Sequence, residues 1–377
     1  MHVPPLKIHF SETDINSIAS DIKHVLRSGQ LSLGNMTKRF EDQFSLLTKR
    51  KYAVAVNSGT TALEILLRVK DVKGKTVIVQ TNTNYATAAA VLFAGGKLKL
   101  VDGGIYPSLD DIKNAVDIST VGIIFVHIGG YLSNELDDLK SYCESKGLFL
   151  IEDAAHAHGA TLKGQPAGNF GHAAAFSFFP TKVITSGEGG MIVTDNKNDY
   201  QKILILRDQG KDPVTKQNVA WGNSWRMSEL QAVLGFHQLK HLAKFVKRRN
   251  EIMKKYASVL GKYNQIRIYT ASEHMIPSGY KFIVQFPTAK ICQQIKKTLE
   301  QEHQVYLGGG VYDIPIHRQP IFKTMFKNKK FPKADHFCTT HLCLPVWSTM
   351  TNQEVEYVIK SVEKVFKKEF DFSNTLV

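Results

Sequence analysis

Seven short apolar runs alternate with helical patterns along the first two thirds of the chain. The runs are YAVAV, TVIVQ, LKLVD, VGIIFVHI, LFLIED, AAFSFF and GMIVTD. Several are apolar on both faces, as strands are in a parallel sheet that helices cover on both sides. The alternation therefore predicts an α/β domain with a largely parallel sheet. In such a sheet, ligands bind beyond the carboxyl ends of the strands, so the residues that follow each run are the first candidates for a site.

The pattern changes at Glu229, after which apolar residues recur at helical intervals through residues 229–260. We expect one long helical stretch that leaves the first domain. A smaller α+β domain follows, and its last helix is predicted to begin at Thr351, because Thr351 and Glu354 form a capping-box pattern. We place a large domain with an N-terminal arm at 1–245 and a small domain at 246–377. The buried face of the last helix is predicted to comprise Val355, Val358, Ile359, Val362 and Phe366.

The composition is that of a folded, soluble globular protein, with 377 residues of which 43% are hydrophobic and 22% charged. No apolar run approaches the roughly 18 residues needed to cross a bilayer, and the start lacks a secretory signal pattern, so we expect a cytoplasmic protein without a membrane segment. The four cysteines form no CxxC pair. They are interpreted as free thiols rather than as a disulfide framework or a zinc site.

The formal net charge of +14 favours anionic partners such as phosphates, nucleic acids or acidic lipids. The basic residues are scattered, and no long arginine-rich or aromatic-interleaved tract is present. Nucleic-acid binding as the main role is therefore disfavoured.

A turn rich in small residues connects YAVAV to the next helical pattern, in the stretch YAVAVNSGTTALEILL. Ser58, Gly59, Thr60 and Thr61 lie where a helix begins, and the free N–H groups of such a turn can bind a phosphate. The alternative is that Asn57 or Ser58 only caps the helix. The stretch matches neither a P-loop nor a GxGxxG pattern, so nucleotide hydrolysis and dinucleotide binding lose support.

An acidic pair follows the run LFLIED. Asp153 stands at the end of an apolar strand, where a carboxylate is costly to bury unless a cationic group pairs with it. Glu152 with Asp153, or His156 with His158, could instead bind a metal. Because no clear third ligand accompanies the histidines, the metal interpretation is the weaker one, and we predict no metal site.

A single lysine, Lys182, follows the run AAFSFF in the stretch FSFFPTKVITSGEGG. Pro180 favours an extended chain before it, which would deliver Lys182 to the carboxyl edge of the sheet. Taken alone, such a lysine is most often a surface residue on a loop. A phosphate cup, a buried aspartate and a lysine after a strand are together the groups that hold pyridoxal 5′-phosphate: the cup binds the phosphate, the aspartate keeps the ring nitrogen protonated, and the lysine bonds the aldehyde.

Six blocks, spread over nearly the whole chain, resemble the DegT/DnrJ/EryC1/StrS family of pyridoxal-phosphate-dependent sugar aminotransferases. They occur in the family's order and are GQLSLGNMTKRFEDQF, NSGTTALEILL, IEDAAHAHGA, FSFFPTKVITSGEGGMIVTD, WRMSELQAVLGFHQL and VYDIPIHRQPIF. The resemblance implies the fold-type I (aspartate aminotransferase) architecture. We therefore expect a large domain with a mostly parallel seven-stranded sheet and a smaller C-terminal α+β domain.

The resemblance also implies roles for single residues. Lys182 matches the Schiff-base lysine and Asp153 the partner of the ring nitrogen, and these two are the expected catalytic residues. His156 matches the position beside the ring, where the family has glutamine or histidine. The expected phosphate contacts are Ser58, Gly59, Thr60 and Ser177, and the residues expected near the substrate are Tyr312 and His317.

Two positions depart from the family pattern. Where the family commonly has an aromatic residue stacked on the ring, this chain has Asn84, so the stacking role passes to the adjacent Tyr85 as a hypothesis. Where the family often has an asparagine that reaches the phosphate of the neighbouring subunit's cofactor, this chain has Ser224, next to Asn223.

The implied reaction is transfer of an amino group from glutamate to a keto sugar, because relatives that act as sugar dehydratases have histidine at the position of Lys182. The expected acceptor is a nucleotide-linked 4-keto or 3-keto deoxyhexose. The first alternative is amination of C8 of an eight-carbon ulosonic acid of lipopolysaccharide, and the second is a non-catalytic regulator that retains the fold. The family also implies a homodimer with shared active sites. The sequence leaves open which sugar and which carbon are aminated.

Overall fold

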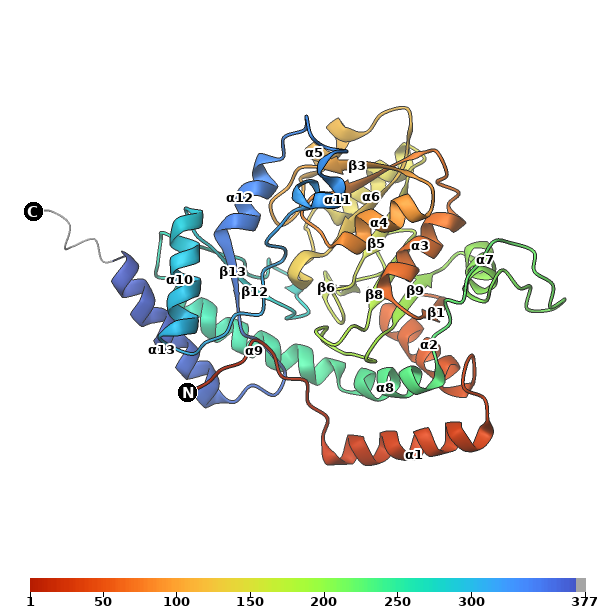
Figure 1. The fold of residues 1–377 in the computed structure, drawn as a ribbon, viewed down its shortest axis with the longest axis horizontal. Helices are drawn as coiled ribbons and strands as arrows, with labels where there is room; N and C mark the ends of the chain where they lie inside the picture. Colours follow the sequence, from red (N-terminus) through yellow and green to blue (C-terminus); the bar gives the residue numbers. More distant parts are fainter. Residues whose placement is uncertain (371–377) are drawn as a thin grey trace, which may run out of the picture.

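The computed structural model describes residues 1–370. A seven-stranded sheet forms the centre of the larger part, in the order β1-β9-β8-β5-β4-β2-β3 (Figure 1). Strand β9 runs antiparallel to both of its neighbours, and the other adjacent pairs are parallel. The predicted mostly parallel sheet is therefore confirmed, and each strand falls on one of the seven apolar runs. The strands are β1 (Tyr52–Val56), β2 (Thr76–Gln80), β3 (Lys97–Val101), β4 (Thr120–Val126), β5 (Phe149–Asp153), β8 (Ala173–Ser177) and β9 (Gly190–Thr194).

Helices cover both faces of this sheet. Successive strand residues point to opposite faces, so each face has apolar side chains to bury. In β1, Ala53 and Ala55 belong to one buried core, whereas Val54 and Val56 belong to the other. On the first side lie α1 (Glu12–Ser28), α2 (Asn35–Thr48), α5 (Leu109–Ala115), α6 (Leu136–Ser145) and α8 (Glu229–Lys240). On the second side lie α3 (Gly59–Val69), α4 (Tyr85–Phe93), α7 (Lys197–Arg207) and α11 (Pro320–Lys323).

A smaller α+β part packs a separate core, as predicted. Its antiparallel sheet has the order β10-β12-β13. A third, three-stranded sheet has the order β11-β6-β7, and two short 3-10 helices complete the elements. The remaining elements are β6 (Thr161–Leu162), β7 (Gln165–Pro166), β10 (Arg267–Ile268), β11 (Met275–Ile276), β12 (Phe282–Gln285), β13 (His341–Leu344), α9 (Leu242–Leu260), α10 (Ala289–Gln301), α12 (Pro332–Thr340), α13 (Asn352–Phe370), η1 (Ile128–Gly130) and η2 (Ile316–Arg318).

The helical stretch over residues 229–260 is two helices rather than one. Helix α8 ends at Lys240 and α9 begins at Leu242, with His241 between them. The His241 ring nitrogen Nε2 lies 2.7 Å from Asp14 Oδ1, so the junction is tied to α1. Helix α9 begins in the first core, to which Leu242 belongs, and continues into the small-domain core (Figure 1). Because one helix serves both cores, the boundary at 245/246 stays a prediction.

The last helix has the predicted cap, and Val355, Val358, Val362 and Phe366 of its predicted buried face are buried, whereas Ile359 is partly buried. Thr351 Oγ1 accepts the N–H of Glu354, and the Glu354 carboxylate accepts the N–H of Thr351. All four cysteines are buried free thiols, as expected. Within residues 1–370, none of the helices is both long and apolar enough to cross a membrane.

Candidate active site

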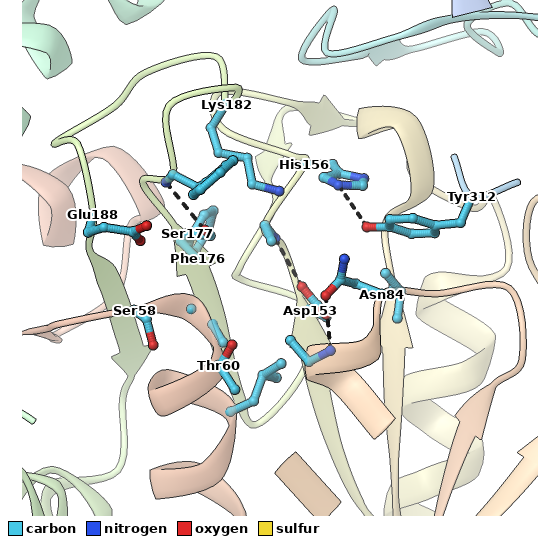
Figure 2. A pocket seen from close by; sticks show the side chains of 17 residues that line it. Ser58, Thr60, Asn84, Asp153, His156, Phe176, Ser177, Lys182, Glu188 and Tyr312 are labelled. Atoms are coloured by element: carbon cyan, nitrogen blue, oxygen red, sulfur yellow. Dashed lines mark hydrogen bonds between the residues drawn. The ribbon is translucent and has the colours of Figure 1, made fainter. Parts of the chain in front are cut away.

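A cavity of about 290 Å³ lies at the carboxyl edge of the large sheet. Its walls come from the turn after β1, the start of α4, the ends of β5 and β8, the loop after β8, and Tyr312 of the C-terminal part (Figure 2). Eight of the residues predicted from the sequence line this cavity, namely Ser58, Gly59, Thr60, Asp153, His156, Ser177, Lys182 and Tyr312. Residues far apart in the sequence thus meet at the edge where a parallel sheet binds ligands.

The turn before α3 both caps the helix and leaves donors free. Ser58 Oγ accepts the N–H of Thr61 at 3.1 Å, so the capping interpretation holds. The N–H groups of Gly59 and Thr60 have no acceptor among residues 1–370. A Cβ at Gly59 would lie 2.8 Å from Cβ of Ser177, so glycine is needed for this close approach. The free N–H groups and the helix dipole make the turn suitable for a phosphate as well.

Asp153 is a buried carboxylate with no cationic side chain paired to it among residues 1–370. Its side chain ends β5 and the residue is 5% exposed. Thr87 Oγ1 donates to Asp153 Oδ2 at 2.7 Å, and the N–H of Ala155 donates to Oδ1 at 3.2 Å. Asp153 makes no ion pair within the described part of the chain. Because burying an unpaired carboxylate is costly, the site suits a ligand that brings a positive charge to Asp153.

Lys182 reaches the cavity from the loop that follows β8. Its backbone N–H donates to the Phe179 carbonyl at 3.0 Å, and its Nζ lies 5.2 Å from the centre of the Tyr280 ring. Figure 2 shows the side chain descending toward the space between His156 and Asp153. No carboxylate in residues 1–370 forms an ion pair with Lys182. The amine is therefore available to a ligand.

His156 is held as a neutral ring with a defined proton. The N–H of Gly129 donates to Nδ1 at 3.3 Å, and the ring stacks on Tyr280 with centroids 4.2 Å apart. Burial, with a smaller effect of nearby Lys182, lowers the pKa of His156 well below its ordinary value. The single ring proton therefore belongs on Nε2, which lies 3.1 Å from the Tyr312 hydroxyl (Figure 2). Nε2 donates to that oxygen, so the hydroxyl proton of Tyr312 is free for an acceptor in the cavity.

The residues considered as metal ligands have other contacts. Glu152 accepts hydrogen bonds from His127 Nε2 and from the N–H groups of Gly168, Phe170 and Gly171. The His158 ring packs between Phe176 and Phe178, and burial lowers its pKa to about 3. In the described part of the chain, no group of three His, Cys, Asp or Glu side chains is arranged to hold a metal ion.

Tyr85 does not line the cavity, and its stacking role stays a prediction. It is the first residue of α4, its side chain is 45% exposed, and its ring is 6.0 Å from that of Phe322. Asn84 and Ala86 line the cavity instead. Successive residues at a helix start point in different directions, so Asn84 keeps the inward position and Tyr85 turns away.

His317 does not line this cavity, and its expected place near the substrate stays a prediction. Its ring is buried, with Nδ1 2.8 Å from Thr81 Oγ1 and Nε2 3.0 Å from Asp335 Oδ1. One nitrogen therefore ties η2 to the residue after β2, and the other ties it to α12.

Ser224 does not line the cavity of its own chain. Arg226 Nη2 donates to its hydroxyl at 2.7 Å, and Ser224 is exposed. Its predicted contact with the cofactor of a neighbouring subunit stays a prediction.

Asn84, Glu188 and Tyr280 are polar residues in or next to the cavity that were not predicted for the site. Asn84 and Glu188 line the cavity, and Tyr280 lies beneath Lys182 and His156. Glu188 carried one signal, its place between glycines in the loop after Lys182. Tyr280 comes from the small domain, and no local pattern marked it.

Comparisons with known proteins agree with this geometry. The model of the DegT/DnrJ/EryC1/StrS aminotransferase family matches residues 12–363. The chain is 31% identical to the spore coat polysaccharide biosynthesis protein SpsC of Bacillus subtilis, over 92% of this chain and 94% of that protein. It is 28% identical to GDP-perosamine synthase of Escherichia coli O157:H7, over 89% and 91%. The PLP form of Spr1654 from Streptococcus pneumoniae, described as a putative sugar aminotransferase, is 25% identical with a TM-score of 0.87, over 98% of this chain and 99% of that chain.

Proposed function

We propose that this chain, which belongs to the DegT/DnrJ/EryC1/StrS aminotransferase family and is a pyridoxal-phosphate-dependent sugar aminotransferase, moves an amino group from glutamate to a nucleotide-linked keto sugar. The observation that carries the proposal is the pairing of Lys182 with Asp153 across one cavity, each without an ion-pair partner among residues 1–370. A cationic ring nitrogen and an aldehyde on the same ligand would satisfy both.

The residues present fit pyridoxal phosphate. The N–H groups of Gly59 and Thr60, with the hydroxyls of Ser58 and Ser177 nearby, would bind the phosphate. When bound, the cofactor supplies an electron sink for the carbon that carries the amino group. Asp153 would hold a proton on the ring nitrogen.

Lys182 would hold the cofactor and move the proton. Its Nζ faces the cavity and is therefore placed to bond the aldehyde carbon and, once released, to serve as base and acid. His156, neutral and stacked on Tyr280, would pack beside the ring. Tyr312 would donate its hydroxyl proton to an oxygen of the substrate or the cofactor.

The acceptor is proposed to be a 4-keto or 3-keto deoxyhexose linked to a nucleotide. A net charge of +14 suits a diphosphate, and GDP-perosamine synthase is among the relatives. The runner-up is an eight-carbon ulosonic acid, which is anionic through a carboxylate.

The working form is proposed to be a cytoplasmic homodimer whose two active sites are shared. Support comes from a segment that projects from the large domain between α7 and α8 (Figure 1). It carries Val214, Val219 and Trp221, which are 86%, 58% and 94% exposed. Such side chains favour burial against another surface, and Ser224 follows in the same segment.

The test is a panel of nucleotide-linked keto sugars and eight-carbon keto acids. Each would be incubated with the cofactor-loaded protein and glutamate, and release of 2-oxoglutarate would be measured. We expect release with a nucleotide-linked sugar and none with Lys182→Ala. Release only with the eight-carbon acids would favour the runner-up, and no release with any acceptor would contradict the proposal.

A further inference from the structure

A second cavity of about 380 Å³ lies beside Tyr280, whose ring centre is 5.2 Å from Lys182 Nζ. Thr181, which precedes Lys182, and Tyr280 contribute to its wall, so the two cavities are neighbours. Lys281 is the sole charged residue among those that line it. The other lining residues are Pro5, Leu6, Leu307, Gly308, Cys343, Leu344 and Val346.

The Lys281 ammonium has no anionic partner in residues 1–370. Its Nζ donates to the carbonyl oxygens of Gly308 at 2.7 Å and Gly309 at 3.4 Å, and no carboxylate lies within ion-pair distance. A Cβ at Gly308 would lie 3.4 Å from Nζ, so glycine leaves room around the ammonium. Two carbonyl oxygens orient the group but leave its charge uncompensated, and an ammonium has three protons to donate.

The surroundings of Tyr280 are strongly cationic. Lys182 Nζ and Lys281 Nζ lie 5.2 Å and 5.5 Å from the centre of its ring. Burial alone would raise the pKa of Tyr280, yet the two lysines lower it. They also contribute to the lowered pKa of His156, after burial. Two lysines that share one aromatic ring without a carboxylate make a site that an anion would stabilise.

The remaining wall of the second cavity favours an apolar stem. Leu6, Leu307, Leu344 and Val346 offer aliphatic surface, and Thr181, the residue before Lys182 in the chain, contributes to the wall. A ligand in this cavity would therefore contact both aliphatic side chains and one cation. A short methylene chain ending in a carboxylate has this character.

We propose that the cavity around Lys281 is a carboxylate subsite that binds the side-chain carboxylate of the amino donor. This inference rests on the proposed function, because it assigns the amino donor to the same reaction centre. It makes Lys281 a specificity-determining residue that selects glutamate over amino acids with uncharged side chains of the same length.

The test compares glutamate with glutamine in the donor half-reaction. In Lys281→Met, kcat/KM for glutamate should fall about tenfold to a hundredfold, as expected when a charged hydrogen bond is lost. The value for glutamine should stay unchanged, and Lys281→Arg should retain part of the preference. Lys262→Met is the matched control, because Lys262 is a small-domain lysine paired with Glu363 at the surface; it should change neither value.

Other outcomes would overturn the assignment. Equal losses for glutamate and glutamine would mean that Lys281 only supports the 308–309 turn. A loss confined to an acidic acceptor, with glutamate unaffected, would assign the carboxylate to the acceptor instead. Calorimetric binding of glutarate, which has no amino group, separates this inference from the reaction: binding by the wild type that is lost in Lys281→Met would support the subsite even if no transamination occurred, and equal binding by both proteins would contradict it.

Discussion

The hydroxyl of Tyr312 has a fixed direction because of a chain of hydrogen bonds. The N–H of Gly129 fixes the proton of His156 on Nε2, and Nε2 donates to the Tyr312 oxygen. Burial raises the pKa of Tyr312 well above its ordinary value of 10, so the hydroxyl remains a donor across the working range. The residue is therefore placed to stabilise negative charge on a ligand oxygen.

Tyr312→Phe should lower kcat/KM about tenfold while leaving the fold intact. The ratio of wild-type to variant activity should stay constant from about pH 6 to about pH 10, because the hydroxyl does not lose its proton in that range. The measurement is the pH profile of both proteins.

Tyr256→Phe is the matched control for this experiment. Its hydroxyl donates to the Pro345 carbonyl at 3.0 Å inside the small domain, so its loss should lower stability and leave kcat/KM unchanged. Equal activity of the wild type and Tyr312→Phe would contradict the donor role. A ratio of wild-type to variant activity that falls toward one at a pH below 9 would also contradict it.

The site residues that could be predicted from the sequence share one property, their place after an apolar run. Lys182, Asp153 and Ser58 each follow an apolar run, and the topology brings such positions to one edge. The contacts of His317 could not be predicted in this way. Its partner Thr81 is distant from it in the sequence, and no local pattern marks its other partner, Asp335. Burial of a histidine by such partners is a tertiary property that no local pattern reports.

The Glu152 carboxylate links strand β5 to the loop before β8. Glu152 is fully buried and accepts one hydrogen bond from His127 and three from backbone N–H groups. Burial raises the pKa of Glu152, but the hydrogen bond from His127 and the backbone donors outweigh it, and the net shift is downward from 4.5. The folded protein thus binds this proton more weakly than the unfolded chain. The carboxylate contributes stability above about pH 4.5, and this is lost as the pH falls through the folded-state pKa.

Glu152→Gln should lower the free energy of unfolding by about 3 kcal/mol at neutral pH, because it removes a buried charge that four donors surround. The difference from wild type should shrink as the pH falls below about 4. Urea unfolding of both proteins at neutral and acidic pH measures it. Glu144→Gln, at an exposed site in α6, should change little. A constant difference at all pH values would contradict the account.

Apolar patterning located all seven strands of the large sheet because each is a compact run with buried neighbours on both faces. The same patterning missed the break at His241. Helical periodicity continues through α8 and α9, and His241 at the break contacts Asp14, which lies in another helix.

For the molecule as a whole, the projecting segment between α7 and α8 bears on the assembly. Trp221→Glu places a charge where the proposed dimer would bury an aromatic side chain. Sedimentation velocity should show the wild type as a dimer and the variant shifted toward monomer. Its affinity for pyridoxal phosphate should also fall, because Ser224 would no longer reach the neighbouring site.

Ile118→Glu is the control, since Ile118 is fully exposed in the loop before β4 and lies outside this segment. It should leave the mass and the cofactor affinity unchanged. A wild-type monomer with full activity would rule out the shared active site.

The division into a large α/β part and a smaller α+β part was predictable because the patterning changes near Glu229, whereas the way in which the two parts share α9 was not. Leu242 packs in the large-domain core, while Ile252 and Met253 of the same helix pack in the other. Tyr280 crosses from the small domain to the active site in the same manner. Such sharing depends on long-range packing, which periodicity along a single helix does not report.

Lys182 is the residue proposed to bond the cofactor, and the other proposed roles in the cavity depend on it. The most direct measurement is borohydride reduction of the protein loaded with pyridoxal phosphate, followed by mass spectrometry of its peptides. The account predicts loss of the visible absorption band and a single modified peptide, with the added mass on Lys182. Cofactor fixed to a different lysine, or a protein that takes up no cofactor at all, would contradict it.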